Sequence, residues 1–596
     1  MMRPTMITRT PHRGKAPRPG GIGRIVASAA GGLLCAVALT AQSPWWWPQW
    51  GRTPQHDGAS PVVAQPLDAI LADVVYDPFV DQMKADVEGG DLLAHYAVPL
   101  VDATGVYMVF KSGTFTTFGD WSGITWNVTR LEWIGGLLQP AWTFQSDWKP
   151  ASVDLTQWEP VFLPAMTATD LYVPGLGGSV HRVSKDTGKE LERLNPFSDL
   201  DPSRFVAGGL AIAPDGGVVY DVVALDPSDA LGPITGAWLA RVAAGGQAGA
   251  AAFSTLIPGA PGANDSCQSA FSSEQAPLPP STTAVPPTIS CGDQRPGINV
   301  VPAIASNGTI YTLSRAHNAD RYSYLVAVRP DLTPLWAVSL RHLLNDGCGV
   351  LLQDDNSSLG CRAGANQGVD PETNDQPSGR VADAGTSSPA VLPDGSIAVG
   401  VFTGYNFYRG HLLKFDAAGE FLADYDFGWD ITPAVYQHDG TYSVLIKDNH
   451  YATSDGTAFY DITSLDSDFV PEWSYRATNT ESCVRQSDGS ISCVDDEPEG
   501  FEWCVNQPAV DGAGIVFANS EDGTLYAFDP HGNLVEKIFL NTALGAAYTP
   551  VAIGPNGIVY TQNNGHLFAV GAPFVARQHP TAAPVAPPAP RIVGRP

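Results

Sequence analysis

Short apolar segments that begin at a Pro and continue through a tight-turn sequence recur along the chain from residue 98 to residue 571. In "TPVAIGPNGIVYT", which starts at Thr549, Pro opens an apolar stretch, Asn-Gly follows, and a β-branched and aromatic run comes next. Pro is tolerated at the first residue of a strand, and Asn-Gly favours a tight hairpin turn. Each segment therefore predicts a β-hairpin. The eight copies begin at Val98, Leu163, Gly209, Val301, Ser388, Thr432, Gln507 and Thr549, and the copy at Gly209 is degenerate because it lacks the opening Pro.

A second recurring element follows the first and has the form Gly-x-Leu-x-Ala-Phe-Asp. Its clearest copy is "GTLYAFDPHGN" at Gly523–Asn533, which predicts a further strand and turn. In three copies the next strand carries Pro-x-Trp, at Trp142, Trp336 and Trp473, and we expect these indoles to pack. Two hairpins form a four-stranded antiparallel sheet, and neighbouring sheets must cover its faces. The sequence thus predicts an all-β fold, an eight-bladed β-propeller of four-stranded blades.

The last copy, Thr549–Gly571, offers only three strands. An open fourth edge would invite aggregation, so we expect a strand at about Leu67–Asp77 to complete that blade. The predicted organisation is a signal peptide or anchor at 1–41, a strap at 42–66, a propeller at 67–572 with insertions near 252–300, 341–385 and 474–504, and a disordered Pro/Ala-rich tail at 573–596.

Composition and charge agree with export. A low charged fraction of 16%, with 61 Gly and 50 Pro, favours short strands and turns. The net charge of −28 makes nucleic acid and anionic membranes unsuitable partners. The apolar run Ile25–Ala41 follows a basic N-terminus and is short for a membrane span. We expect a secreted, periplasmic or cell-surface monomer without a membrane span after signal removal, or else an N-terminally anchored protein.

Seven cysteines follow the predicted signal, all within the three insertions. They are Cys267, Cys291, Cys348, Cys361, Cys483, Cys493 and Cys504. Their local grouping predicts disulfides that close loops in an oxidising compartment. The natural pairs are Cys267–Cys291 and Cys348–Cys361, and Cys483 pairs with Cys493 or Cys504. No Cys-x-x-Cys occurs, so zinc and c-type haem are disfavoured and no metal site is predicted.

Three stretches resemble the PQQ-like β-propeller superfamily, the quinoprotein-dehydrogenase-like eight-bladed propellers. They are "WPQWGRTPQHDG" at Trp47–Gly58, "DGTLYAFD" at Asp522–Asp529 and "KDTGK" at Lys185–Lys189. The resemblance covers nearly all of the chain after the predicted signal. It implies a fold shared by PQQ-dependent alcohol dehydrogenases, by scaffold propellers of outer-membrane assembly and by other exported proteins. Fold alone does not choose among these functions.

The resemblance also implies what an enzyme of this superfamily would carry. The dehydrogenases use a disulfide between adjacent cysteines above the quinone and a calcium ion held by Glu, Asn and Asp. This sequence has no Cys-Cys pair, and "TGKELERL" lacks the Trp of the docking motif. We therefore favour a non-enzymatic binding or scaffold protein for a protein, glycan or small polar ligand, with no catalytic residue and no cofactor assigned. The alternative is a quinoprotein-like oxidoreductase with PQQ and calcium, or a hydrolase, at the channel mouth.

Residues just before the strand-opening Pro are expected to crowd one mouth of the central channel, where polar groups could bind a ligand. The densest polar and aromatic cluster in the chain combines the stretches Tyr405–His411, Phe427–Val435 and Ile446–Tyr451. The predicted ligand-binding residues are Tyr405, Asn406, His411, Trp429, Asp430, Thr432, Lys447, Asp448, Asn449, His450, Asn506, Gln507 and Tyr548. The competing interpretation is that these groups bond to the backbone of neighbouring blades and to trapped water, as buried polar groups do.

The tryptophan-rich stretch Trp45–Gly58 admits three interpretations: a membrane-interface belt, an aromatic binding patch or a strap that leads into the ring. Because Trp47–Gly58 carries part of the family resemblance, we expect a strap. Trp50 and Arg52 should then pack against a blade.

Overall fold

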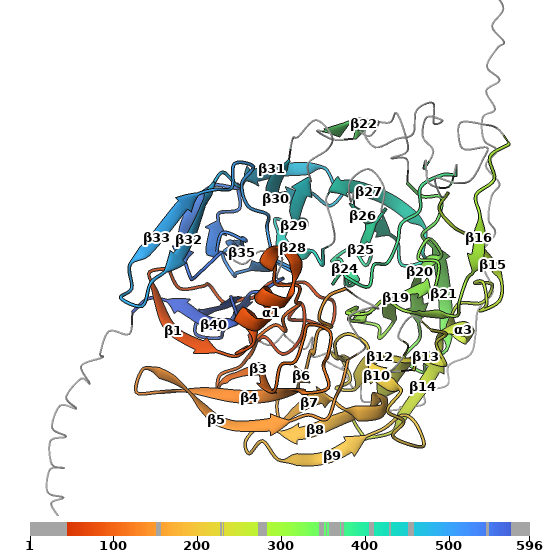
Figure 1. The fold of residues 1–596 in the computed structure, drawn as a ribbon, viewed down its shortest axis with the longest axis horizontal. Helices are drawn as coiled ribbons and strands as arrows, with labels where there is room; N and C mark the ends of the chain where they lie inside the picture. Colours follow the sequence, from red (N-terminus) through yellow and green to blue (C-terminus); the bar gives the residue numbers. More distant parts are fainter. Residues whose placement is uncertain are drawn as a thin grey trace, which may run out of the picture. The chain divides into compact units, whose positions relative to one another are not determined.

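The computed structural model describes residues 45–150, 157–226, 229, 232–271, 283–344, 351–352, 355–356, 370, 373, 375–403, 410–427, 431–450, 458–543 and 548–573. All of them belong to one compact unit, Pro44–Pro596. Eight antiparallel sheets follow one another around a central axis (Figure 1). They confirm the predicted all-β eight-bladed propeller.

The blades contain the following strands. Blade 1 has β2 (Leu100–Val101), β3 (Val106–Gly113), β4 (Ile124–Ile134) and β5 (Leu137–Gln145); blade 2 has β6 (Ala165–Met166), β7 (Asp170–Pro174), β8 (Val180–Ser184) and β9 (Glu190–Leu194). Blade 3 has β10 (Arg204–Val206), β11 (Ala211–Ile212), β12 (Val218–Ala224), β13 (Gly236–Val242) and β14 (Ala248–Ala252); blade 4 has β17 (Gln294–Pro296), β18 (Ala303–Ile304), β19 (Ile310–Ala316), β20 (Ser323–Val328) and β21 (Pro334–Ser339).

Blades 5 to 8 repeat this order. Blade 5 has β24 (Ala390–Val391), β25 (Ile397–Phe402), β26 (Gly410–Phe415) and β27 (Phe421–Phe427); blade 6 has β28 (Ala434–His438), β29 (Thr441–His450), β30 (Phe459–Leu465) and β31 (Pro471–Arg476). Blade 7 has β34 (Ala509–Val510), β35 (Val516–Asn519), β36 (Thr524–Phe528) and β37 (Leu534–Phe539); blade 8 has β38 (Ala552–Ile553), β39 (Val559–Asn563), β40 (His566–Gly571) and β1 (Ala69–Val75).

Short helices and small hairpins complete the described elements. They are α1 (Val80–Asp86), η1 (Glu88–Gly90), η2 (Leu176–Gly178), α3 (Phe253–Leu256), β15 (Ser266–Gln268), β16 (Thr288–Ser290), β22 (Leu351–Leu352), β23 (Asp355–Asn356), β32 (Glu481–Arg485) and β33 (Ile491–Asp495). None of the helices in the described ranges is long and apolar enough to cross a bilayer.

The ring closes with a strand from the N-terminal part of the chain. Strand β1 pairs antiparallel with β40, from Ala69↔Gly571 to Val75↔His566. The prediction of a strand at about Leu67–Asp77 is therefore confirmed. Because the first and last parts of the chain share one sheet, the ring has no open blade edge at its closure.

Tryptophans of the outer strands connect consecutive blades. The indole N–H groups of Trp142, Trp336 and Trp473 donate to the carbonyls of Lys185, Ala417 and Pro530 at 2.9, 3.1 and 3.0 Å. Each acceptor lies in the last turn of the next blade. A Cβ added at Gly532, which has a φ of +81°, would come within 2.6 Å of the Trp473 ring, so this turn needs Gly. The predicted packing of the three indoles is thus present.

The segment Trp47–Gly58, called the strap below, runs along the innermost strands of blades 1 to 7 in order. Its bonds join Trp47 to Val101, Pro48 O to Met166 N, Gln49 Oε1 to Ile212 N, Pro54 O to Ile304 N, Gln55 O to Val391 N, Asp57 O to Val435 N, and Gly58 O to Val510 N. Gln65 N then reaches Gly557 O in blade 8. Trp47 and Trp50 are buried in the core, whereas Trp45 is 68% exposed. The strap interpretation therefore fits the structure.

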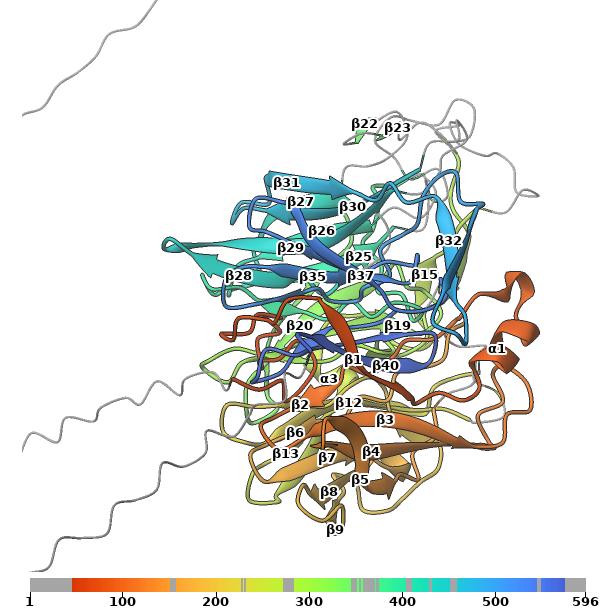
Figure 2. The same ribbon diagram turned by 90° about the vertical axis from the view of Figure 1, so that its left-hand side faces the viewer.

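The two ends of the axis differ. The end at which the innermost strands begin is called the start face. The opposite end, which carries the turns of the first hairpins, is called the turn face. Except in blade 6, the strap bonds to the last residue of each innermost strand that it reaches in blades 1 to 7, and so it lies at the turn face. Helix α1 and the hairpin β32–β33 lie on the opposite side of the ring from the strap (Figure 2).

Two of the predicted disulfides are present. Cys267–Cys291 joins β15 to the residue after β16, and Cys483–Cys493 joins facing residues of β32 and β33. The open choice for Cys483 is thus decided in favour of Cys493, and Cys504 is a buried free thiol. Cys348 and Cys361 lie outside the described residues.

Candidate functional site

The segments that precede the innermost strands form a ring of hydrogen bonds around the start-face mouth. These bonds are Val301 N to Ser388 Oγ, Ser388 N to Thr432 Oγ1, Thr432 N to Asn506 O, Thr549 N to Cys504 O, and Tyr96 N to Tyr548 O, at 2.9 to 3.2 Å. The predicted site residue Thr432 is therefore fully engaged in joining blades. For Thr432, the structure agrees with the interpretation that polar groups of the mouth bond to neighbouring blades.

Three stacked rings cross the middle of the mouth. The centroids of His95, Trp158 and Tyr548 lie 4.8 to 5.3 Å from one another, with nearly parallel planes. His95 Nε2 lies 2.6 Å from the carbonyl oxygen of Ala384, which precedes blade 5 on the other side of the ring. Trp158 keeps a partly exposed side chain, while His95 and Tyr548 are buried. The mouth therefore presents an aromatic surface with Trp158 nearest the solvent.

Lys447 lies against this aromatic stack. Its ammonium is 3.8 Å from the centroid of the Tyr548 ring, a distance at which a cation is attracted to the ring face. Lys447 comes from blade 6, near the end of β29, and is buried. A predicted pair of site residues, Lys447 and Tyr548, is thus brought together from blades 6 and 8.

The predicted cluster Lys447–His450 is divided by the alternation of side chains along β29, because successive strand residues point to opposite faces. Asn449 faces blade 7, where its Nδ2 donates to Trp503 O and its Oδ1 accepts from Trp503 N. Asp448 faces blade 5 and accepts a hydrogen bond of 2.8 Å from the Tyr425 hydroxyl. The four side chains therefore cannot act together on one ligand.

Asp448 and His450 belong to a satisfied buried network. His450 Nε2 lies 2.7 Å from Asp448 Oδ1, and Thr463 Oγ1 donates to Asp448 Oδ2. His411 lies farther out on β26, where its Nδ1 is 3.3 Å from Asp424 Oδ2 on the outer strand of blade 5. These groups stabilise blades 5 and 6. Tyr405, Asn406, Trp429 and Asp430 lie outside the described residues.

Cys504 and Glu521 form a further polar pair at the mouth. The thiol donates to Glu521 Oε1 at 2.9 Å. Burial, and then the charge of Glu502, raises the pKa of Glu521 well above its usual range. Burial, followed by the charges of Glu521 and Glu502, raises the pKa of the Cys504 thiol in the same direction. Burial and like charge thus favour the protonated forms of both groups, and the protonated thiol is a poor nucleophile.

Asn506 has an unusual place in this mouth. Its side chain is fully buried, and neither its Oδ1 nor its Nδ2 has a hydrogen-bond partner among the described residues. The adjacent Gln507, by contrast, donates to His56 O and Pro433 O at 2.9 and 3.0 Å. An unsatisfied buried amide costs about 1–3 kcal/mol, so its presence calls for a ligand, water or another function.

Sequence reasoning did not find His95, Trp158 or Glu521. His95 and Trp158 lie shortly before the repeat copies that begin at Val98 and Leu163, and Glu521 occupies a hairpin turn. Only the fold brings them to the mouth. The one available signal was an aromatic or imidazole side chain just before the first strand of a blade.

Solved structures similar to this chain include dehydrogenases and a BamB protein. A europium-containing methanol dehydrogenase aligns with a TM-score of 0.49 and 11% identity, over 87% of this chain and 89% of that one. A quinohemoprotein alcohol dehydrogenase from Comamonas testosteroni aligns at 0.47 and 11%, over 89% and 81%. BamB from Moraxella catarrhalis aligns at 0.36 and 10%, over 80% and 96%. No protein-family model matches the sequence, and no curated protein matches it. Function is therefore argued from the residues of this chain.

The described residues of the mouth do not fit the quinone PQQ, which is a planar tricarboxylate. The stacked rings of His95, Trp158 and Tyr548 occupy the axis. Lys447 is the ammonium that faces this space, and the carboxyl groups of Glu502 and Glu521 lie close enough to influence each other. The ammonium of Lys447 balances at most one of three buried carboxylates, so these surroundings disfavour the quinone. In the described ranges, no three His, Cys, Asp or Glu side chains gather as metal ligands.

Proposed function

We propose that the protein is an exported, non-enzymatic binding propeller that holds a small polar ligand at its start-face mouth. The observation that carries this proposal is the unsatisfied amide of Asn506, which offers both a donor and an acceptor. The partly exposed ring of Trp158 supplies an aromatic surface in the same mouth.

The proposed location rests on separate observations. The two disulfides suit an oxidising compartment outside the cytoplasm. The predicted N-terminal signal suits the same location. The net charge of −28 favours a soluble, monomeric state and disfavours polyanionic partners.

A pair of adjacent substitutions tests the binding site. Asn506→Leu removes an unsatisfied amide, so the ligand-free protein should gain about 1–3 kcal/mol of unfolding free energy. Gln507→Leu is the matched control, because it removes a satisfied amide and should destabilise the protein. Native mass spectrometry of the exported protein should show a constant mass excess that Asn506→Leu abolishes and Gln507→Leu retains.

Two results would contradict the proposal. One is a mass excess that Asn506→Leu leaves unchanged, since the ligand would then lie elsewhere. The other is a loss of stability in Asn506→Leu together with no mass excess in the wild-type protein, since the amide would then be satisfied by the fold or by water.

A further inference from the structure

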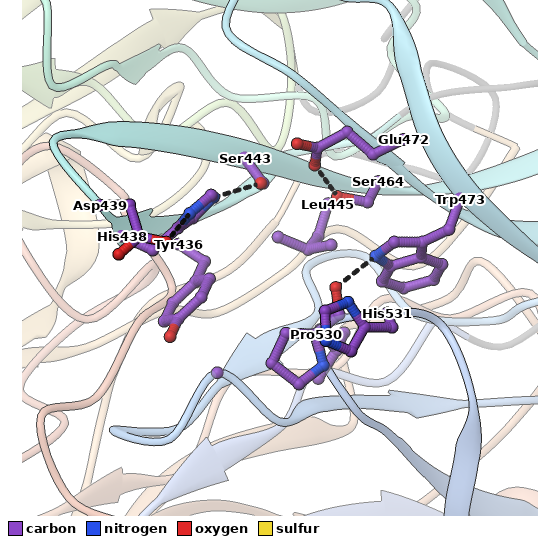
Figure 3. Close-up of a pocket in the computed structure, with 12 residues that line it drawn as sticks. Tyr436, His438, Asp439, Ser443, Leu445, Ser464, Glu472, Trp473, Pro530 and His531 are labelled. Carbon is purple, nitrogen blue, oxygen red and sulfur yellow. Dashed lines mark hydrogen bonds and ion pairs between the residues drawn. The ribbon is translucent and has the colours of Figure 1, made fainter.

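The turn face carries a second candidate site, independent of the start-face mouth. A pocket of about 420 Å³ lies between blades 6 and 7 (Figure 3). Residues of the β28–β29 hairpin form one side, and residues of β31 and of two turns of blade 7 form the other. This volume falls in the range of pockets that bind small molecules.

Aromatic rings form two walls of the pocket. Tyr436 stacks on His438, with ring centroids 5.2 Å apart and planes 23° apart, and His438 Nε2 lies 2.8 Å from Ser443 Oγ. Across the pocket, the Trp473 indole is held by its N–H bond to Pro530 O. These contacts fix the rings before any ligand arrives, which lowers the entropy cost of binding.

The charges that line the pocket are negative. Glu472 points toward it and accepts a hydrogen bond of 2.8 Å from Ser464 Oγ, and the carboxylate of Asp439 is almost fully exposed at its rim. None of the described lining residues is Lys or Arg, and the two lining imidazoles, His438 and His531, are charged only when protonated; His438 Nδ1 lies 3.8 Å from Asp439 Oδ2. The whole chain, at −28, adds a long-range attraction for cations.

We infer that this pocket binds a small organic ammonium ion. Ring faces of Trp and Tyr attract cations within about 6 Å of their centroids, and a nearby carboxylate strengthens the attraction. An inorganic anion would meet Glu472 and Asp439 without a Lys or Arg among the described lining residues to compensate their charge. A neutral molecule of the same shape would make the same ring contacts as the ammonium ion but would lack its attraction to the carboxylates. The charge of the ligand is therefore the property to test.

A second pocket in the same molecule provides a control. It measures about 450 Å³ and lies between blades 8 and 1, with Trp133 and Tyr560 among its lining residues. Its lining includes the guanidinium of Arg130, which lies 2.8 Å from Glu132. Because Arg130 already pairs with that carboxylate, this pocket should not attract an ammonium ion.

The test compares choline with 3,3-dimethylbutan-1-ol, in which carbon replaces the charged nitrogen. Isothermal titration of the exported full chain should show choline binding at least about ten-fold more tightly than the neutral alcohol. Glu472→Gln keeps the size of the side chain and should weaken choline binding about five- to ten-fold. Glu132→Gln changes the net charge equally in the second pocket and should leave choline binding unchanged.

Three outcomes would overturn the inference. They are equal binding of choline and the neutral alcohol, equal losses in Glu472→Gln and Glu132→Gln, and no choline binding to the wild-type protein at millimolar concentration. Circular dichroism and melting temperature check that both variants fold. Because the start-face ligand is not used, failure here leaves the proposed function standing.

Discussion

The substitution Trp50→Ala tests how the strap holds the ring together. Trp50 is only 2% exposed and belongs to the largest hydrophobic cluster, which contains residues from several blades. Truncating a buried Trp to Ala typically costs about 3–5 kcal/mol, from lost transfer free energy and from the cavity left behind. The cost should fall at the upper end, because the strap is hydrogen-bonded to seven blades, six of them through its backbone, and cannot collapse into the cavity.

The assay is equilibrium unfolding in urea followed by circular dichroism, with Trp45→Ala as the matched control. Trp45 is 68% exposed, so its truncation should change the unfolding free energy by less than about 0.5 kcal/mol. The reasoning is refuted if Trp50→Ala unfolds at the same urea concentration as Trp45→Ala. Deletion of Trp47–Gly58 should lower the melting temperature further, and an unchanged value would contradict the role of the strap.

Three further predictions follow from buried groups. Burial raises the pKa of Asp221 to about 8, so the folded state holds a proton that the unfolded state releases near pH 4. Stability should therefore fall by up to about 1.4 kcal/mol per pH unit between about pH 4 and 8, and Asp221→Asn should flatten this slope; parallel pH profiles would disprove the assignment. The Lys111 ammonium lies 2.7 and 2.5 Å from the buried carboxylates of Asp77 and Glu159. Lys111→Met should therefore lower the free energy of unfolding in denaturant by about 3–5 kcal/mol, and a near-neutral effect would contradict the pairing. Cys504 is buried with a raised pKa, so it should react with a thiol reagent only after denaturation; fast labelling of the folded protein would be inconsistent with this.

Much of the fold could be predicted because each blade repeats the same local signals. Pro at the start of the innermost strand and an Asx-Gly turn mark most of the first hairpins, as in Ala552↔Tyr560 and Ile553↔Val559 of blade 8. The closing strand β1 was predictable from the missing fourth strand. The pairing of Cys483 with Cys493 also has a local signal, since both flank the turn at Asp488-Gly489.

The candidate site was harder to predict. Lys447 to His450 looked like one cluster, but the period of two along β29 sends alternate side chains toward different blades. The ring stack at the mouth joins segments from blades 1, 2 and 8 that are distant in sequence. No local pattern determines such a contact, because it depends on how eight blades close around one axis. The lack of a hydrogen-bond partner for the Asn506 amide can likewise be recognised only once the positions of the neighbouring polar groups are known.

The most direct test of the central claim, that the start face binds a ligand and does not support quinone-dependent oxidation, is reconstitution with PQQ and calcium. The purified protein is incubated with both, separated from free quinone, and assayed for bound PQQ absorbance and dye-linked oxidation of a primary alcohol. We predict no retained quinone and no turnover, because the aromatic stack lies in the mouth and the ammonium of Lys447 does not balance three carboxylates. Retained PQQ with turnover would contradict the account and establish an oxidoreductase.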